Sequence, residues 1–183
     1  MRQAAIAFVA LLYAAPAYVV AAPPQPPIEQ RLQRAEDDLA IRRVLLDYAW
    51  ALDHRDIDGY IALFAKNGEW VNGSMVRKAP NEIRSLLVGM FGVPQPGWVN
   101  TQSVEITTNP DIQLEGDHAT AHCWHLLMRR GADGRPVAAL AGRYDDELIR
   151  EDGKWKFLRR VDNPIMPTPE EWAKVMAAQR RGQ

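Results

Sequence analysis

The sequence predicts an α+β fold in which one curved antiparallel sheet wraps around a long N-terminal helix. The first supporting observation is an apolar helical stripe, formed by Ile41, Val44, Leu45, Tyr48 and Leu52. The second is the order of elements, because helical patterns fill the first half and strand-like alternation follows residue 98. The third is a series of glycine-containing turns at 115–117, 131–134 and 151–153, which join the later strands into hairpins.

The helical half has recognisable boundaries. The long helix is expected over 28–52 and is followed by a corner at residues 54–56. Asp56 is a suitable N-cap for a short helix at 57–64, since a carboxylate accepts hydrogen bonds from free backbone N–H groups. Asn67-Gly68 is a turn before a strand at 69–72, and a third helix centred on residues 83–90 ends before Gly92 and Pro94.

The second half predicts a meander of antiparallel strands. Strands are expected at 98–108, 111–114, 119–130, 136–150 and 154–161, and Pro169 opens a short C-terminal helix. A curved sheet that wraps a helix leaves a hollow at its open end. We therefore expect a ligand pocket there.

Composition restricts the classes of function. A chain of 183 residues is one domain, and its formal net charge of -1 gives no argument for nucleic acid or an anionic membrane surface. Cys123 is the only cysteine, so no intramolecular disulfide forms. A zinc site from His122, Cys123 and His125 is improbable, because adjacent strand residues point to opposite faces.

The N-terminus has the pattern of a targeting segment. Arg2 precedes an apolar run over 4–13, and small residues that suit cleavage follow. We expect a signal peptide at 1–22, a proline-rich spacer at 23–30, the folded domain at 31–165 and a helical tail at 166–183. This organisation predicts export to a periplasm, with no membrane contact after cleavage; a retained N-terminal anchor is the alternative.

Several short motifs follow one another at regular intervals: Asp47-Tyr48, Leu52-Asp53-x2-Asp56, Thr108-Asn109-Pro110, Gly142-Arg143-Tyr144 and Trp155-Lys156-Phe157. Together, over about residues 30–163, they resemble the SnoaL-like branch of the NTF2-like superfamily, which includes scytalone dehydratase and hexachlorocyclohexane dehydrochlorinase. The resemblance implies an α+β cone with an internal pocket for a small molecule. It also implies a homodimer or homotrimer that uses no metal or organic cofactor.

The resemblance assigns catalytic positions. Asp53 matches the family's catalytic aspartate, Tyr48 a pocket tyrosine or lysine, and Arg160 a pocket arginine. Glu105 stands where the dehydratase and dehydrochlorinase carry a histidine that pairs with the aspartate. Two carboxylates close together in a dry pocket share a proton, which raises one pKa. Glu105 lies on a polar strand face that points either into such a pocket or to solvent.

His125 is the candidate replacement for the missing histidine. It alternates with Ala121, Cys123 and Leu127, a small and apolar set that suits the inner face of a strand. A structural or interface role is the alternative. The last strand raises a conflict, because alternation from Trp155 and Phe157 turns Arg159 inward, whereas the resemblance assigns Arg160; a β-bulge would reconcile them.

The remaining substrate-contact candidates are Trp70, Asn109, Leu127 and Tyr144, at positions that the resemblance places on the pocket wall or in its motifs. The leading hypothesis is a cofactor-independent lyase or isomerase that abstracts a proton from a small cyclic or aromatic molecule, with elimination of water or formaldehyde as examples. The alternative is a non-catalytic periplasmic protein that binds a small molecule, and a weaker one is an assembly module.

Overall fold

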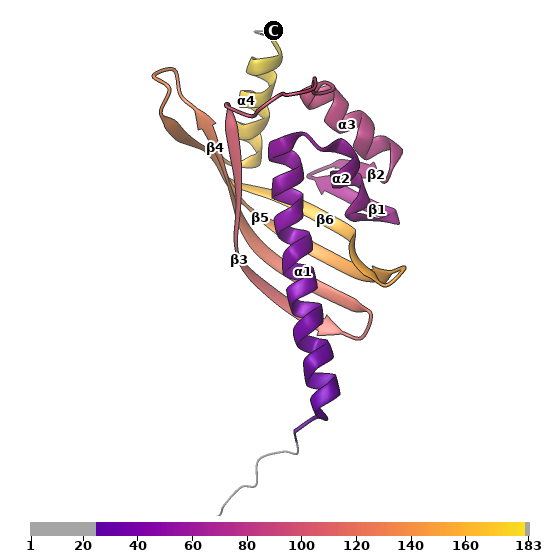
Figure 1. Cartoon of the computed structure of the whole chain (residues 1–183). Helices are drawn as coiled ribbons and strands as arrows, with labels where there is room; N and C mark the ends of the chain where they lie inside the picture. The colour runs from indigo at the N-terminus through magenta and orange to yellow at the C-terminus, as the bar shows by residue number, and fades with distance from the viewer. Residues whose placement is uncertain (1–24, 182–183) are drawn as a thin grey trace, which may run out of the picture.

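The computed structural model describes residues 25–181, so the expected signal peptide at 1–22 lies outside the described residues. Four helices and six strands occur in this part of the chain (Figure 1). The helices are α1 (Ile28–His54), α2 (Ile57–Ala62), α3 (Asn81–Phe91) and α4 (Pro169–Arg181). The strands are β1 (Phe64–Asn72), β2 (Met75–Lys78), β3 (Ser103–Glu115), β4 (His118–Arg130), β5 (Pro136–Glu151) and β6 (Lys154–Met166).

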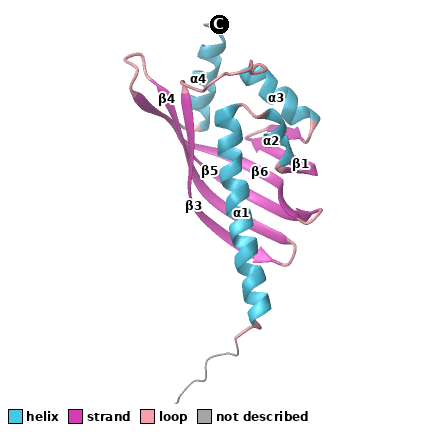
Figure 2. Ribbon diagram, viewed as in Figure 1, coloured by secondary structure: helices cyan, strands magenta, loops and turns pink. Residues whose placement is uncertain are grey.

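The six strands form one sheet in the order β2-β1-β6-β5-β4-β3. Helix α1 runs across the concave face of this curved, unclosed sheet, while α2 and α3 lie near its β1–β2 end (Figures 1 and 2). This arrangement confirms the predicted α+β fold. One pairing differs from the expected all-antiparallel sheet, because β1 runs parallel to β6. The β1–β6 pairing joins distant parts of the chain, so no turn motif in the sequence predicts it.

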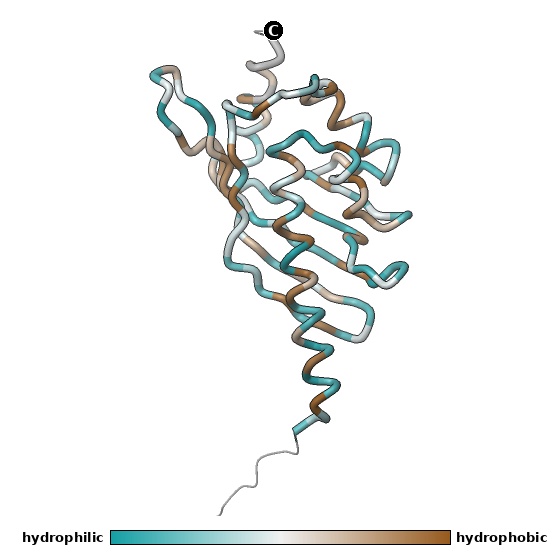
Figure 3. Tube along the Cα trace, in the orientation of Figure 1, coloured by the Kyte–Doolittle hydropathy of each residue, from teal (hydrophilic) through white to brown (hydrophobic). Residues whose placement is uncertain are grey.

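Helix α1 is held on the sheet by its apolar stripe. Ile41, Val44, Leu45 and Tyr48 are buried against a core that includes Leu148, Trp155 and Phe157 of the sheet. Apolar and polar segments alternate along α1 (Figure 3), as expected of a helix with one buried face. The helix ends where Arg55 adopts a left-handed conformation, with φ 52° and ψ 34°, and its N–H donates to the carbonyl groups of Ala51 and Leu52.

Asp56 caps α2 as predicted, since its side chain accepts a hydrogen bond of 2.9 Å from the N–H of Gly59. The expected strand at 98–108 begins only at Ser103, because residues 92–102 form a connecting segment with no helix or strand. This segment leaves α3 and passes over the C-terminal end of α1 before it enters β3 (Figure 1). Arg55 holds it, because its guanidinium carbon lies 4.1 Å from the ring centre of Trp98 and its Nη1 donates to the carbonyl of Phe91.

Strand β3 is continuous from Ser103 to Glu115, whereas two separate pieces were expected. A bulge between Thr108 and Asp111 joins the two pieces, and Asn109 takes a left-handed conformation there with φ 53°. No helix within residues 25–181 combines the length and apolar character that a membrane crossing requires.

Candidate functional site

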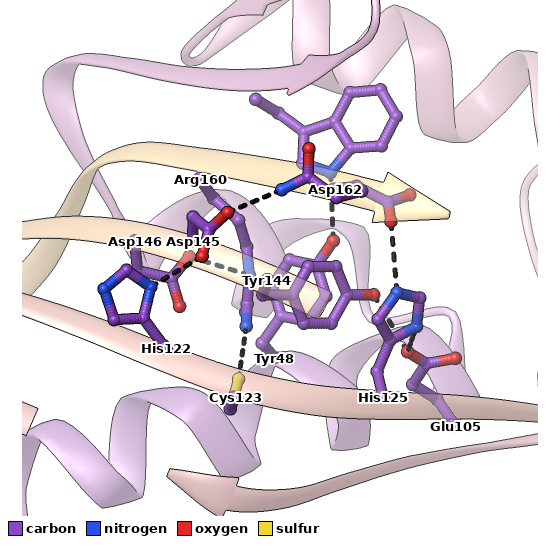
Figure 4. Close-up of polar contacts among 12 residues, drawn as sticks. Tyr48, Glu105, His122, Cys123, His125, Tyr144, Asp145, Asp146, Arg160 and Asp162 are labelled. Carbon is purple, nitrogen blue, oxygen red and sulfur yellow. Dashed lines mark hydrogen bonds and ion pairs between the residues drawn. The ribbon is translucent and has the colours of Figure 1, made fainter. Parts of the chain in front are cut away.

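A cluster of ionisable side chains forms where the C-terminal end of α1 meets strands β3, β4 and β6. Glu105, His125 and Asp162 project from these three strands toward one another (Figure 4). Asp53 reaches the cluster from α1 and accepts a hydrogen bond of 3.0 Å from the N–H of Glu105. The structure therefore brings together three residues that the sequence predicted, Asp53, Glu105 and His125.

Asp53 is the acid that α1 contributes to this cluster. Its side chain is half-buried, and its hydrogen bond from Glu105 occupies only the Oδ1 atom within residues 25–181. Burial raises the pKa of Asp53, the N–H of Glu105 opposes that rise, and the nearby Glu105 carboxylate adds to it. A carboxylate with a raised pKa and one free oxygen is a suitable proton acceptor.

His125 lies between two carboxylates. Its Nδ1 atom is 3.0 Å from Glu105 Oε1 and its Nε2 atom is 3.1 Å from Asp162 Oδ1. Both contacts have ion-pair distances, although neither has in-line hydrogen-bond geometry, so attraction between charges accounts for them. Burial alone would lower the pKa of His125, but Asp162 and Glu105 outweigh it and raise the pKa to about 9. His125 is therefore an imidazolium at neutral pH.

Glycine at position 142 makes room for the imidazolium. Gly142 pairs with His125 across β4 and β5, and a Cβ atom there would lie 2.3 Å from His125 Nε2 and 2.8 Å from the carbonyl oxygen of Asn163. A side chain cannot occupy that position without moving the ring. The Tyr144 ring stacks on His125 at a centroid distance of 4.0 Å and closes its other side.

Three tyrosine hydroxyls and one indole N–H lie in the same region. Tyr60 Oη donates to Tyr48 Oη at 2.8 Å and Trp70 Nε1 donates to the same oxygen at 3.1 Å. Because Tyr48 Oη accepts both bonds, its own proton is free for another partner. Tyr144 Oη donates to Glu105 Oε1 at 2.8 Å. Burial raises the pKa of Tyr48, so the hydroxyl stays protonated at neutral pH.

Arg160 points inward, as the resemblance indicated, but its guanidinium does not face open space. The guanidinium carbon lies 3.8 Å from the ring centres of both Tyr48 and Tyr144, and Nε lies 3.1 Å from Asp146 Oδ1 (Figure 4). The side chain is fully buried. Arg160 therefore packs against the rings of Tyr48 and Tyr144, and Asp146 balances its charge.

The conflict between Arg159 and Arg160 is resolved by an irregularity in β6. Leu148 pairs with Phe157 and Glu147 pairs with Arg159, so Leu158 is an extra residue in β6 at this point. After the bulge the inward face passes to Arg160 and Asp162. Arg159 turns outward and its Nη1 atom lies 3.0 Å from Glu69 Oε2.

Two other candidates do not contribute to the cluster. Asn109 is exposed at the β3 bulge, and Thr108 Oγ1 donates to its side-chain oxygen. His122 lies on the opposite face of β4 from His125, where its Nδ1 is 2.6 Å from Asp145 Oδ1. Leu127, by contrast, is half-buried and pairs with Glu105 across β3 and β4. Residues 25–181 contain no group of three or more His, Cys, Asp or Glu placed to hold a metal ion.

Sequence reasoning missed Asp162, Asn72 and Tyr60. Asn72 Nδ2 donates to Asp162 Oδ2 at 2.9 Å, a contact that depends on the parallel pairing of β1 with β6. The signal for Asp162 was its spacing of two residues from Arg160, which is informative only once the bulge is known. Tyr60 is buried, and its hydroxyl donates to Tyr48.

The cluster is closed in this conformation. The side chains of Glu105, His125 and Asp162 are 7%, 2% and 14% exposed. A hollow of about 790 Å³ lies elsewhere, between the start of α1 and the β3–β4 turn, and another of about 300 Å³ lies beside α3. The pocket expected at the cluster therefore stays a prediction.

Comparison with known proteins gives a consistent result. A family model described as a SnoaL-like domain matches residues 33–161. A search of curated proteins found no match. Among solved structures, a candidate aromatic ring hydroxylase from Novosphingobium aromaticivorans is 28% identical with a TM-score of 0.58, and the alignment covers 78% of this chain and 94% of that one.

Two further solved structures show the same fold. A candidate scytalone dehydratase from Novosphingobium aromaticivorans is 24% identical, with a TM-score of 0.59 and coverage of 76% of this chain and 89% of that one. A hexachlorocyclohexane dehydrochlorinase of type 3 from Novosphingobium barchaimii LL02 is 20% identical, with a TM-score of 0.60 and coverage of 73% and 90%. At these identities the likeness concerns the fold alone.

Proposed function

The chain belongs to the SnoaL-like domain family of the NTF2-like superfamily, and from that premise we propose that it is a cofactor-independent lyase or isomerase. The proposed substrate is a small cyclic or aromatic molecule from which the protein removes a proton. One observation carries the proposal: direct contacts join Asp53, Glu105 and His125, and Tyr48 packs against Tyr144, whose hydroxyl donates to Glu105. Such an array supplies a base and an acid within one site.

In the proposed reaction Asp53 is the general base. Its free Oδ2 atom accepts a proton from a carbon of the substrate, and the C–H electron pair becomes the new C=C bond. The leaving group departs with its own bonding pair and takes a proton from Tyr48 Oη where it needs one. His125, as an imidazolium, balances Glu105 and Asp162, which leaves Asp53 as the acid free to act. Positioned acid–base groups typically contribute about 10²–10⁴-fold to rate.

The substrate class is supported by the names of the compared structures. A dehydratase and a dehydrochlorinase both catalyse eliminations, of water and of hydrogen chloride. The name of the third refers to an aromatic ring. For a phenolic substrate that carries a hydroxymethyl group, the step differs: Asp53 would take the proton of the hydroxymethyl O–H, and the C–C bond to the ring would break to release formaldehyde. The ring carbon would keep the electron pair of that bond and take a proton from Tyr48 Oη.

The test is Asp53→Asn, assayed on a panel of cyclic β-hydroxy ketones, chlorinated cyclohexanes and hydroxymethyl phenols. We expect wild-type turnover of at least one member and a loss of about 10²-fold or more in the variant. Asp58→Asn is the matched control, since the Asp58 side chain is 84% exposed and contacts only Arg84 among the described residues. A folded Asp53→Asn protein with undiminished turnover would exclude Asp53 as the base.

Assembly into a homodimer or homotrimer is a further part of the proposal. The outer face of the sheet carries exposed apolar side chains on β3, β4 and β6, namely Val104, Ile106, Trp124 and Ile165. Such a patch is typical of a subunit interface. Trp124→Glu should reduce the mass measured by sedimentation equilibrium, whereas a monomeric wild type would contradict the proposal.

Export to a periplasm rests on the sequence of residues 1–22. We propose that this segment is cleaved by a signal peptidase in the native host. N-terminal sequencing of the protein from a periplasmic fraction should give a start near residue 23. Recovery of the chain with Met1 from the cytosol would contradict the proposal.

A further inference from the structure

We propose that Asp162 is a positioning residue, which keeps His125 doubly protonated and so makes the imidazole a fixed positive charge for Glu105 rather than a base. The inference rests on the proposed function only for its catalytic consequence. The charge on His125 and its dependence on Asp162 can be measured without a substrate.

The argument begins with the two ring nitrogens. A neutral imidazole has one N–H and one lone pair. His125 presents Nδ1 to Glu105 Oε1 at 3.0 Å and Nε2 to Asp162 Oδ1 at 3.1 Å. A neutral ring would therefore leave one nitrogen without a proton at 3.0 or 3.1 Å from a carboxylate oxygen, which is repulsive. With a proton on each nitrogen both contacts are attractive, and burial at 2% side-chain exposure strengthens them.

Asp162 is held in place from the neighbouring strand. Asn72 lies directly opposite it in the parallel pairing of β1 and β6, and Asn72 Nδ2 donates to Oδ2 at 2.9 Å. That bond occupies one carboxylate oxygen and turns the other toward His125. Asparagine suits this position, since its amide donates to an acid without adding a charge.

The other groups around His125 do not replace Asp162. Tyr144 from β5 stacks on the ring, and its hydroxyl donates to Glu105 rather than to the imidazole. Arg160 lies on β6 at the Tyr144 ring and pairs with Asp146. Within residues 25–181 the hydrogen bond that the Asp53 side chain accepts comes from the backbone of Glu105. Asp162 is thus the acid that faces Nε2, and without it Nε2 can lose its proton.

The consequence concerns Glu105 and Asp53. Glu105 Oε1 is occupied by His125 and by the hydroxyl of Tyr144, whereas the Asp53 carboxylate has one oxygen outside its hydrogen bond with the Glu105 backbone. If His125 became neutral, Glu105 would lose its counter-charge beside Asp53. The raised pKa of His125, about 9, agrees with this assignment.

The experiment follows the imidazole NMR signals of the intact protein across a pH series. In the wild type we expect His125 to be doubly protonated at pH 7 and to titrate near pH 9. In Asp162→Asn the side-chain amide can donate to Nε2, so the midpoint should fall by at least one pH unit, a tenfold loss of proton affinity. Asn72→Ala removes the hydrogen bond to Asp162 but keeps the charge of Asp162, so it should lower the His125 midpoint by less. This variant provides the test if Asp162→Asn does not fold.

The matched control is Asp145→Asn. Asp145 faces His122 on the outer side of β4, so its substitution should remove that contact and leave the titration of His125 unaltered. A neutral His125 at pH 7 in the wild type, or an unchanged midpoint in folded Asp162→Asn, would overturn the inference. If the titrations agree and Asp53→Asn retains full turnover, the proposed reaction fails while the role of Asp162 holds. With a substrate, the alkaline limb of the pH–rate profile should move with the His125 midpoint in Asp162→Asn.

Discussion

Asp146 and Arg160 form an ion pair in the core, with 3.1 Å between Oδ1 and Nε and no exposure of either side chain. The pair lies directly beneath Tyr48 and Tyr144, whose rings enclose the guanidinium. Two charges in such a place are stable only together, because each is costly to bury alone. The pair therefore couples the stability of the core to the placement of the tyrosines.

Arg160→Met tests this coupling. The substitution keeps a long apolar side chain but leaves Asp146 without a counter-charge, so we expect a loss of about 3–5 kcal/mol in the free energy of unfolding. Chemical denaturation measures it. The double variant Arg160→Met/Asp146→Leu should recover much of the loss, and Arg159→Met, on the partly exposed pair with Glu69, should cost at most about 1 kcal/mol. Equal losses at positions 159 and 160 would contradict the account.

Gly142→Ala should disturb His125 directly. The added Cβ would meet Nε2 at 2.3 Å and a backbone oxygen at 2.8 Å, so either the ring or the β5–β6 contact must shift. We expect a destabilisation of about 1–3 kcal/mol and a changed His125 NMR signal. Gly89→Ala is the control, since no atom of the described part of the chain lies within 4 Å of its added Cβ, and alanine favours a helix. A Gly142→Ala protein as stable as Gly89→Ala would show that the site has more space than the structure indicates.

The stability of the protein should depend on pH through His125. Folding raises the pKa of His125 from 6.5 to about 9. A raised pKa means that the stabilisation is complete below pH 6.5 and is lost as the pH rises through 9. The difference corresponds to roughly 3 kcal/mol, which denaturation at pH 6 and pH 10 should reveal. His125→Gln should remove this component of the pH dependence, whereas His122→Gln should keep it.

Tyr48→Phe and Tyr60→Phe should differ in cost. Removal of the Tyr48 hydroxyl leaves both Trp70 Nε1 and Tyr60 Oη without their acceptor. Removal of the Tyr60 hydroxyl deletes one donor, and Tyr48 Oη still accepts the hydrogen bond from Trp70 Nε1. We expect about 1–3 kcal/mol for the first variant and less for the second, by thermal or chemical unfolding. In a turnover assay the first variant should also be the slower one, because Tyr48 donates the proton in the proposed reaction.

The local parts of the structure were predictable from sequence. The spacing of Ile41, Val44 and Leu45 predicted the buried face of α1, and alternation along β4 turned His125 inward and His122 outward. These features depend on helix and strand periodicity alone. The corner at Asp56 was equally readable, since an N-cap acts on its own helix.

The long-range parts were not predictable. Strict alternation assigns Arg159 to the interior, and only the bulge at Leu158 turns Arg160 and Asp162 there instead. The position of the bulge depends on how β6 pairs with both β1 and β5, and the sequence of β6 alone does not specify that pairing. Asn72 meets Asp162 through the parallel β1–β6 pairing, which joins opposite ends of the folded domain. For this reason the sequence did not predict that Asp162 would lie beside His125.

The parallel pairing of β1 with β6 also determines how late β1 can complete its sheet contacts while the chain is being synthesised. Phe64 pairs with Phe157, so β1 has only the short β2 as a neighbour until nearly the whole domain has left the ribosome. Non-local pairings of this kind are slow to form because loop closure must precede them. A nascent chain that stops before Lys154 therefore exposes one edge of β1, which makes truncated products prone to aggregation.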